Sequence, residues 1–213
     1  MINHPPWYIE KHRNTLSMIK QNAGNIELVF IGDSIVSAWA DKGVEAWNTY
    51  FSPYGALNLG FNGDCTEDVV WRIENRQLAG LSPTLVILKI GTNNTGHRRD
   101  EAEKTAAEIG YIIDLIRKVL PYSHVLLHAL MPRGRKPTSP LRQVNNEVNE
   151  RIKLFATRPN VSWVDVNDLF LDSEGVIRQS IMEDALHPNA DQYLPWAKAL
   201  APHVSSIFNT CKK

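Results

Sequence analysis

Four short stretches of the sequence carry residue types that together could hydrolyse an ester. Ser34 offers a hydroxyl nucleophile, and His187 offers an imidazole that could take up its proton. Asp184, three residues before His187, could accept a hydrogen bond from that ring and fix its tautomer. The backbone amide of Gly63 and the side-chain amide of Asn93 could hold the oxyanion of a tetrahedral intermediate. Together these groups predict nucleophilic catalysis of ester hydrolysis.

Each stretch also has a simpler interpretation when it is taken alone. Asp33 and Ser34 are residue types that cap helix N-termini, and the tripeptide that ends at Ser34 by itself favours a cap. The glycines around Gly63 fit an ordinary turn, and asparagine, as at position 93, is common where a strand ends. His187 could be an exposed loop histidine beside a solvated acid. Only the combination of the four stretches predicts a site.

Short apolar runs precede these stretches and predict the strands of a parallel sheet. The predicted strands span Leu28–Ile31, Ala56–Leu59, Leu85–Ile90, Val125–Leu130 and Val161–Val166. The first three end just before the stretches that hold Ser34, Gly63 and Asn93. In open α/β sheets the working site lies at the carboxyl ends of the strands, so we expect these residues to meet there.

Amphipathic segments alternate with the apolar runs and predict helices. They span about 66–78, 101–120, 141–155 and 188–207, and a further helix over 7–20 is predicted at the sheet edge. Thr66 is expected to cap its helix, and Pro195 and Pro202 predict a kink in the last one. This alternation predicts a flavodoxin-like three-layer α/β/α fold with a central parallel sheet of about five strands. We expect one domain over 1–213, with residues 1–25 forming a helical segment packed on it.

The composition excludes several other classes of protein. The 213 residues are 43% hydrophobic, and 23 basic and 23 acidic residues cancel, so no global field would attract nucleic acid. No apolar run approaches the roughly 20 residues of a membrane span. The N-terminus lacks the pattern of a signal peptide, which predicts a cytoplasmic protein, although a precursor trimmed before this numbering would look the same. Cys65 and Cys211 lack the spacing of a disulfide framework or a zinc site, and neither a metal nor a cofactor is expected.

The four stretches resemble the four blocks of the SGNH (GDSL-like) hydrolases, and they run in the order of that family. The matching residues are Gly32-Asp33-Ser34, Gly63, Asn93 and Asp184-Ala185-Leu186-His187-Pro188. Ile35-Val36 follows the serine, so the chain lacks the Gly-x-Ser-x-Gly elbow of ordinary α/β-hydrolases. Within the superfamily the chain is most similar to the catalytic subunits of intracellular platelet-activating-factor acetylhydrolase and their bacterial relatives. That similarity lies mainly in residues 30–34, 56–58, 70–72, 91–94, 132–134 and 140–145.

The resemblance implies a role for each residue. Ser34 would be the acyl-accepting nucleophile, His187 its general base, and Asp184 the group that orients His187. The backbone amides of Ser34 and Gly63, with the side chain of Asn93, would form the oxyanion hole. The implied activity is hydrolysis of short-chain acyl esters, acetyl esters above all, with an O-acetylated sugar or a lipid-like ester as substrate.

Two other functions remain open on the same resemblance. A lysophospholipase or thioesterase would share the fold, and a catalytically silent domain could serve as a binding or assembly module. The animal relatives form dimers, so a homodimer is compatible with the resemblance.

The sequence supports a prediction for three further polar residues. Asn94 and Arg133 are candidates for contacts with substrate, although the basic segment 133–136 by itself favours a solvated loop. Lys89 interrupts an apolar run, and a buried ammonium needs a partner or access to water. We therefore expect Lys89 to lie at an edge or to extend its charge into solvent.

Overall fold

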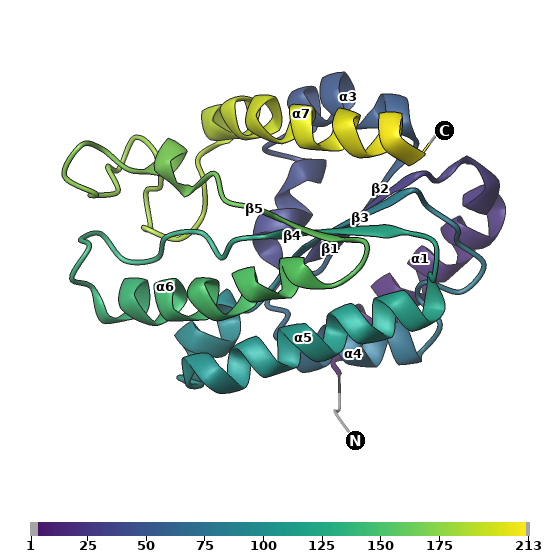
Figure 1. The fold of residues 1–213 in the computed structure, drawn as a ribbon, viewed down its shortest axis with the longest axis horizontal. Helices are drawn as coiled ribbons and strands as arrows, with labels where there is room; N and C mark the ends of the chain where they lie inside the picture. Colours follow the sequence, from purple (N-terminus) through teal and green to yellow (C-terminus); the bar gives the residue numbers. More distant parts are fainter. Residues whose placement is uncertain (1–3, 212–213) are drawn as a thin grey trace.

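Five parallel strands form the centre of the computed structural model, which describes residues 4–211 (Figure 1). They are β1 Leu28–Gly32, β2 Ala56–Gly60, β3 Leu85–Lys89, β4 His124–His128 and β5 Val161–Val164. Their order in the sheet is β2-β1-β3-β4-β5, which confirms the predicted flavodoxin-like topology. Gly32 pairs with Gly60 on one side and with Lys89 on the other, so the carboxyl ends of the first three strands are level.

β1 and β2 extend one residue beyond their predicted ends, to Gly32 and Gly60, whereas the last three strands are shorter than the apolar runs that predicted them. β3 stops one residue before Ile90, β4 covers His124–His128, where 125–130 was predicted, and β5 ends two residues before Val166. Ile90, Ala129 and Leu130 are still buried after their strands end. The runs continue past the sheet because the loops at its carboxyl edge are also buried.

Helices cover both faces of the sheet and make the three layers that were predicted (Figure 1). One face carries α1 Pro6–Asn22, α4 Thr66–Glu74, α5 Ala102–Val119 and α6 Pro140–Ile152. The other carries α2 Ser34–Ser37, α3 Val44–Tyr50 and α7 Tyr193–Cys211. Alternate strand residues serve the two layers: Val29 faces α4 and α5, whereas Phe30 faces α3 and α7.

Several helix boundaries differ from the sequence expectation. Cys65, not Thr66, is the N-cap of α4, and that helix ends at Glu74. α7 begins at Tyr193, later than the predicted start at 188, which places Pro195 in its first turn, where no intrahelical amide bond is lost. The N-terminal helix lies inside the predicted segment 1–25, whose first three residues fall outside the described part of the chain.

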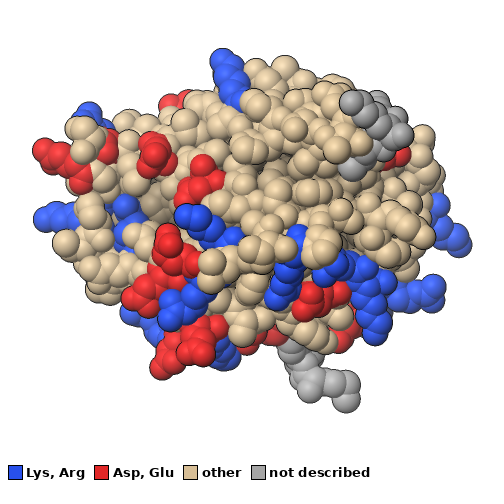
Figure 2. All heavy atoms as spheres, viewed as in Figure 1, with Lys and Arg blue, Asp and Glu red and all other residues tan. Residues whose placement is uncertain are grey.

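Charged side chains of both signs are interspersed on the face of the molecule shown in Figure 2. Most of them lie over the side occupied by α5 and α6, and the region over α7 carries few. No helix in the described residues is long and apolar enough to cross a membrane.

A buried histidine at the end of β4 is held in its neutral form. Nδ1 of His128 lies 2.6 Å from the carbonyl oxygen of Ala129, and Nε2 lies 2.9 Å from Nε1 of Trp196. An indole nitrogen can only donate, so Nε2 accepts and Nδ1 carries the proton. Burial, opposed by the hydrogen bond to Ala129, lowers the pKa of His128 to about 3.

We expect His128 to make the fold sensitive to acid. In the unfolded chain the residue takes up a proton near its ordinary pKa of about 6.5, whereas in the fold it does so only near 3. The unfolded state therefore binds more protons between these values, and the free energy of unfolding rises with pH across that window. His128→Gln should reduce this slope by about one proton, or about 1.4 kcal/mol per pH unit.

Urea titrations at several pH values between about 4 and 6 measure this slope. Leu127→Ala, at the neighbouring position of the same strand, is the matched control, because it destabilises the fold without removing a titratable group and should leave the slope as in the wild type. An unchanged slope in His128→Gln would contradict the assignment of His128 as a buried neutral group.

Candidate active site

Ser34 lies on a tight turn between β1 and α2. The side chain of Asp33 accepts a hydrogen bond of 2.9 Å from the backbone N–H of Ile35 and caps the helix. A Cβ at Gly32 would lie 2.3 Å from the carbonyl oxygen of Lys89, so only glycine fits the end of the strand. The predicted cap is therefore real, but Asp33 supplies it, which leaves the hydroxyl of Ser34 to another partner.

That partner is His187. Oγ of Ser34 lies 2.9 Å from Nε2 of His187, and Nδ1 of the same ring lies 2.6 Å from Oδ2 of Asp184. The other carboxylate oxygen of Asp184 accepts hydrogen bonds from the backbone N–H groups of Leu186 and His187, at 3.0 and 2.8 Å. Ser34, His187 and Asp184, predicted together from the sequence, are thus brought into one hydrogen-bonded row.

The charge of Asp184 suits this arrangement. Partial burial acts to raise the pKa of its carboxyl, but hydrogen bonds from the ring and backbone of His187 and from Leu186 lower the pKa below its usual value. An ionised carboxylate at Nδ1 keeps the proton on that nitrogen, so Nε2 is free to accept from the hydroxyl of Ser34.

Arg135 fixes the segment that leads to Asp184. Its guanidinium donates hydrogen bonds of 2.8 to 3.1 Å to the carbonyl oxygens of Ile177, Met182 and Glu183. The expectation of a solvated basic loop is wrong at this residue. No sequence signal indicates this role, because any residue type can supply a backbone carbonyl.

Gly63 and Asn93 come together through Asp64. Gly63 has a φ of +83°, a conformation that favours glycine, and Asn93 follows β3 in a buried position. Nδ2 of Asn93 donates a hydrogen bond of 2.8 Å to the carbonyl oxygen of Asp64, the residue next to Gly63. An amide nitrogen carries two hydrogens, so this bond orients Asn93 and leaves its second N–H for another acceptor.

A buried ion pair anchors the turn that carries Gly63. Oδ2 of Asp64 lies 3.0 Å from Nε and 2.6 Å from Nη2 of Arg72, and both side chains are inaccessible to solvent. Burial raises the pKa of Asp64 to about 7, against the opposing effect of Arg72. The guanidinium also packs 4.3 Å from the ring centre of Phe61, at the start of the same turn.

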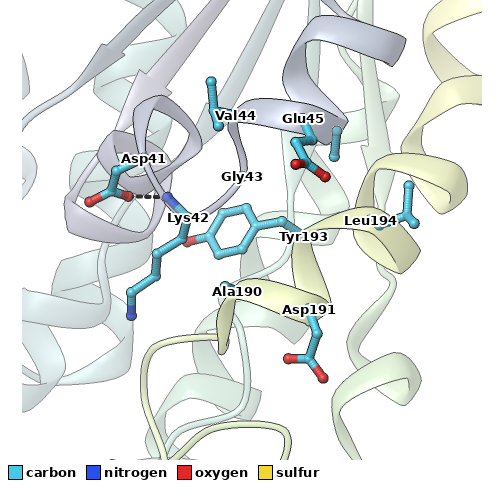
Figure 3. A pocket seen from close by; sticks show the side chains of 10 residues that line it. Asp41, Lys42, Gly43, Val44, Glu45, Ala190, Asp191, Tyr193 and Leu194 are labelled. Carbon is cyan, nitrogen blue, oxygen red and sulfur yellow. Dashed lines mark hydrogen bonds between the residues drawn. The ribbon is translucent and has the colours of Figure 1, made fainter.

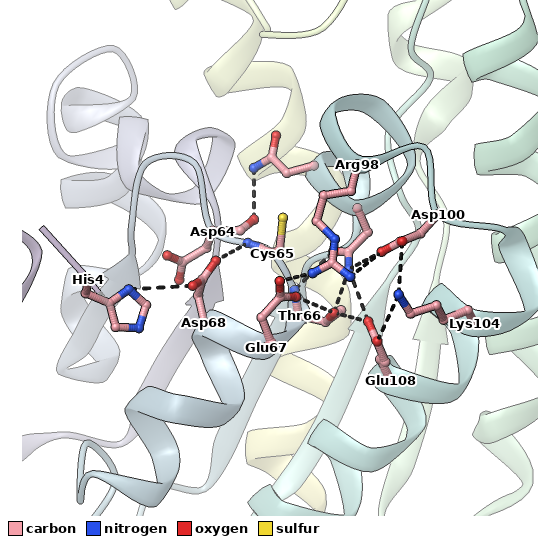
Figure 4. A network of polar contacts seen from close by, with 12 residues as sticks. His4, Asp64, Cys65, Thr66, Glu67, Asp68, Arg98, Asp100, Lys104 and Glu108 are labelled. Atoms are coloured by element: carbon pink, nitrogen blue, oxygen red, sulfur yellow. Dashed lines mark hydrogen bonds and ion pairs between the residues drawn. The ribbon is translucent and has the colours of Figure 1, made fainter. Parts of the chain in front are cut away.

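The side chain of Asn94 is part of a buried network, and its contact with substrate stays a prediction. Its side chain is fully buried, accepts from the backbone N–H of Thr66 at 3.0 Å and donates to Oγ1 of Thr66 at 2.7 Å. A further bond of 3.1 Å reaches Glu108. These residues belong to a network that also holds Glu67, Arg98, Asp100 and Lys104 (Figure 4). Asn94 therefore joins α4 to α5.

Arg133 is half-buried, so the solvated loop expected from the sequence is wrong here as well. Its Nη1 donates a hydrogen bond of 2.5 Å to the carbonyl oxygen of Thr92, just before Asn93. The guanidinium packs so closely on Gly96 that a Cβ there would lie 1.7 Å from Nη1. Arg133 thus supports the loop after β3, and its contact with substrate stays a prediction.

Lys89 is buried in the centre of the sheet, which corrects the expectation of an edge or solvent-reaching position. β3 lies between β1 and β4, and only 1% of Lys89 is exposed. Its Nζ lies 3.8 Å from Oδ1 of Asp33.

Three small cavities surround His187 and the loop at Lys42. The first, of about 370 Å³, is lined by Ser34, Ser37, Ala38, Ala40, Asp41, Lys42, Asn62 and His187. The second, of about 350 Å³, is lined by Lys42, Glu183, Asp184, His187 and Asn189. A third, of about 460 Å³, lies between the starts of α3 and α7, where Tyr193 separates Lys42 from Leu194 (Figure 3). Within the described residues, no group of three or more histidine, cysteine or acidic side chains could hold a metal ion.

Comparison with known proteins identifies the family of this chain. Residues 30–194 match the model of the GDSL-like Lipase/Acylhydrolase family. Platelet-activating factor acetylhydrolase IB subunit alpha1 of Rattus norvegicus is 39% identical over 175 residues, which cover 82% of this chain and 73% of that protein. The alpha2 subunit of Gallus gallus is 36% identical over 194 residues, covering 91% of this chain and 81% of that protein.

Solved structures share the fold at lower sequence identity. A GDSL-like lipase from Bacteroides thetaiotaomicron has a TM-score of 0.74 at 18% identity, over 93% of this chain and 97% of its own. The family match and the identity to the acetylhydrolase subunits together show that this chain belongs to the GDSL-like lipase/acylhydrolase family and is a hydrolase of esters.

Proposed function

We propose that this chain is a serine esterase that hydrolyses short-chain acyl esters, acetyl esters in particular, through an acyl-enzyme intermediate. The observation that carries the proposal is the row formed by Ser34, His187 and Asp184, with separations of 2.9 and 2.6 Å. A hydroxyl bonded to a ring nitrogen whose other nitrogen faces a carboxylate is an activated nucleophile. This row also favours an enzyme over a catalytically silent binding module.

The reaction follows from the positions of these atoms. Oγ of Ser34 forms a bond to the acyl carbon while its proton passes to Nε2 of His187, and the carbonyl electron pair moves onto oxygen. When the carbonyl re-forms, the bond to the alcohol oxygen breaks and that oxygen takes the proton from His187. A water molecule then attacks the acyl-enzyme in the same way, which releases the acid and restores Ser34.

The negative oxygen of each tetrahedral intermediate needs hydrogen-bond donors. We assign this role to the backbone N–H groups of Ser34 and Gly63 and to the second N–H of Asn93. Support comes from the bond between Asn93 and the carbonyl of Asp64, which fixes the amide beside the turn of Gly63. Donors held in place before the reaction stabilise the transition state without reorganisation.

Asn93→Ala should lower kcat for p-nitrophenyl acetate by about 10²- to 10³-fold, because one oxyanion donor is lost. KM should change little, since the intermediate gains more from this bond than the substrate does. Asn149→Ala is the matched control: Asn149 is also a buried amide, but it bonds to the backbone of Leu130 instead. Similar losses of kcat in the two variants would contradict a role for Asn93 in the oxyanion hole.

The preference for a short acyl group is supported by the cavity at Ser34. Its volume is about 370 Å³, and its lining is polar except for small residues such as Ala38 and Ala40. The match to a protein named an acetylhydrolase points the same way. An acyl chain of eight carbons would gain binding energy only from an extended apolar surface that removes it from water.

A chain-length series of p-nitrophenyl acetate, butyrate and octanoate tests this preference. We expect kcat/KM to fall steeply from acetate to octanoate. A higher kcat/KM for octanoate would instead favour a lysophospholipase or thioesterase of the same fold.

A further inference from the structure

We propose that Lys89 is a positioning residue for this reaction, which acts through Asp33 on the turn that carries Ser34. The proposal rests on the role proposed above for Ser34. Its basis is a pair of opposite charges buried next to the nucleophile.

The position of Lys89 is unusual for a lysine. It is the last residue of β3, a central strand, and pairs in register with Gly32 at the end of β1. Its side chain shares a face with Leu85 and Ile87, which pack under α7. Burying an ammonium group at such a place is unfavourable unless an opposite charge compensates for it.

Asp33 supplies that charge. Nζ of Lys89 lies 3.8 Å from Oδ1 of Asp33, and the two residues are 1% and 0% exposed. On the neighbouring strand His128 is neutral, because burial lowers its pKa to about 3, so it adds no second positive charge beside Lys89. Neither Nζ of Lys89 nor Oδ2 of Asp33 has a hydrogen-bond partner in the described residues. The two groups therefore act on each other mainly through their charges.

Asp33 links Lys89 to the turn that carries Ser34. Its Oδ1 accepts the 2.9 Å bond from the N–H of Ile35, and its carbonyl oxygen accepts one of 2.8 Å from the N–H of Ser37. These bonds fix the first turn of α2, on which Ser34 is the first residue. The turn thereby sets the direction of both the hydroxyl and the backbone N–H of Ser34.

Loss of the lysine charge would slow the reaction by either of two routes. If Asp33 stays ionised, a negative charge without a partner lies beside Ser34 and opposes the negative oxygen of the intermediate. If Asp33 takes up a proton, its carboxyl becomes a weaker acceptor for Ile35 and the turn is held less firmly. Both routes act on the transition state more than on substrate binding, so the expected effect is on kcat.

Lys89→Met tests the proposal, because methionine has nearly the length of lysine without its charge. Rates on p-nitrophenyl acetate are divided by the number of serines that react with a fluorophosphonate probe, so that unfolded protein does not count. We expect kcat per reactive serine to fall by about 10- to 100-fold, less than for loss of an oxyanion donor, and KM to stay within about twofold.

Rescue by a second substitution shows whether Lys89 acts through Asp33. Asparagine caps a helix as well as aspartate does but carries no charge. Lys89→Met combined with Asp33→Asn should therefore recover most of the kcat lost in Lys89→Met. It should also be faster than Asp33→Asn alone, in which the lysine would be the charge without a partner.

Ile87→Ala is the matched control, on the same strand and facing the same helices as Lys89. It should lower the melting temperature and leave kcat per reactive serine unchanged. The proposal is overturned if Lys89→Met behaves in the same way, or if the double variant is no faster than either single one. If Lys89→Met yields no folded protein, kcat per reactive serine of the double variant is compared with that of Asp33→Asn alone. A double variant that is no faster then overturns the proposal. Failure of the probe to label Ser34 in the wild type would instead overturn the proposed function.

Discussion

Ser34→Ala should lower kcat for p-nitrophenyl acetate by about 10⁴-fold or more. Oγ of Ser34 is the atom that lies 2.9 Å from Nε2 of His187, and without it no acyl-enzyme can form. Alanine keeps the first turn of α2 and the backbone N–H at position 34, so substrate should still bind with a similar KM. The residual rate would come from water attacking an ester held by the remaining oxyanion donors.

Ser37→Ala is the matched control for this experiment. Ser37 lies at the other end of α2 and lines the same cavity, but its hydroxyl lies 3.5 Å from Nζ of Lys11 and does not contact His187. It should retain wild-type kcat. Mass spectrometry should find a fluorophosphonate adduct on the peptide with Ser34 in the wild type and in Ser37→Ala. Equal rates in Ser34→Ala and the wild type would contradict the serine mechanism and favour a binding module.

The fold and the row of Ser34, His187 and Asp184 were predictable because their determinants are local in the sequence. Apolar runs of strand length, separated by helical periodicity, predict parallel strands, and parallel strands place their carboxyl ends at one edge. Ser34, Gly63 and Asn93 each follow such a run, so their convergence follows from topology. His187 and Asp184 could be assigned together because three residues is a spacing that allows a side chain to reach back to a ring.

The sequence does not distinguish the neighbours Asn93 and Asn94. Both follow β3, and either amide could have been directed to the site. The backbone after Asn93 turns into a helical segment over 94–98, which sends Asn94 towards Thr66 of α4 and leaves Asn93 beside Asp64. Side-chain direction depends on this local backbone conformation, and two identical residue types give no sequence signal for it.

Partners distant in the sequence account for the remaining differences. Arg135 acts on backbone carbonyls about 40 residues away, and Lys89 acts on a carboxylate across a pair of strands. The sequence around each of these two residues does not indicate which group it contacts. From the sequence, a lysine in an apolar strand is therefore expected to extend its charge into solvent. In the structure, the pairing of Lys89 with Gly32 places the lysine beside Asp33 instead.

Asp184→Asn should lower kcat by about 10⁴-fold while leaving the fold intact. Oδ1 of Asp184 accepts the backbone N–H groups of Leu186 and His187, and the carbonyl oxygen of an asparagine can accept the same bonds. The amide nitrogen would then face Nδ1 of His187, where the carboxylate had been. Since that nitrogen donates, Nδ1 must accept, and the ring proton moves to Nε2.

A ring protonated at Nε2 cannot take the proton of Ser34, so the row keeps its geometry and loses its function. Circular dichroism and the melting temperature should stay close to the wild type while kcat falls. Glu183→Gln is the matched control, since it removes one negative charge from the same cavity without touching His187. If Asp184→Asn keeps more than about a tenth of the wild-type kcat, Asp184 does not set the tautomer, and His187 must be oriented by its backbone alone.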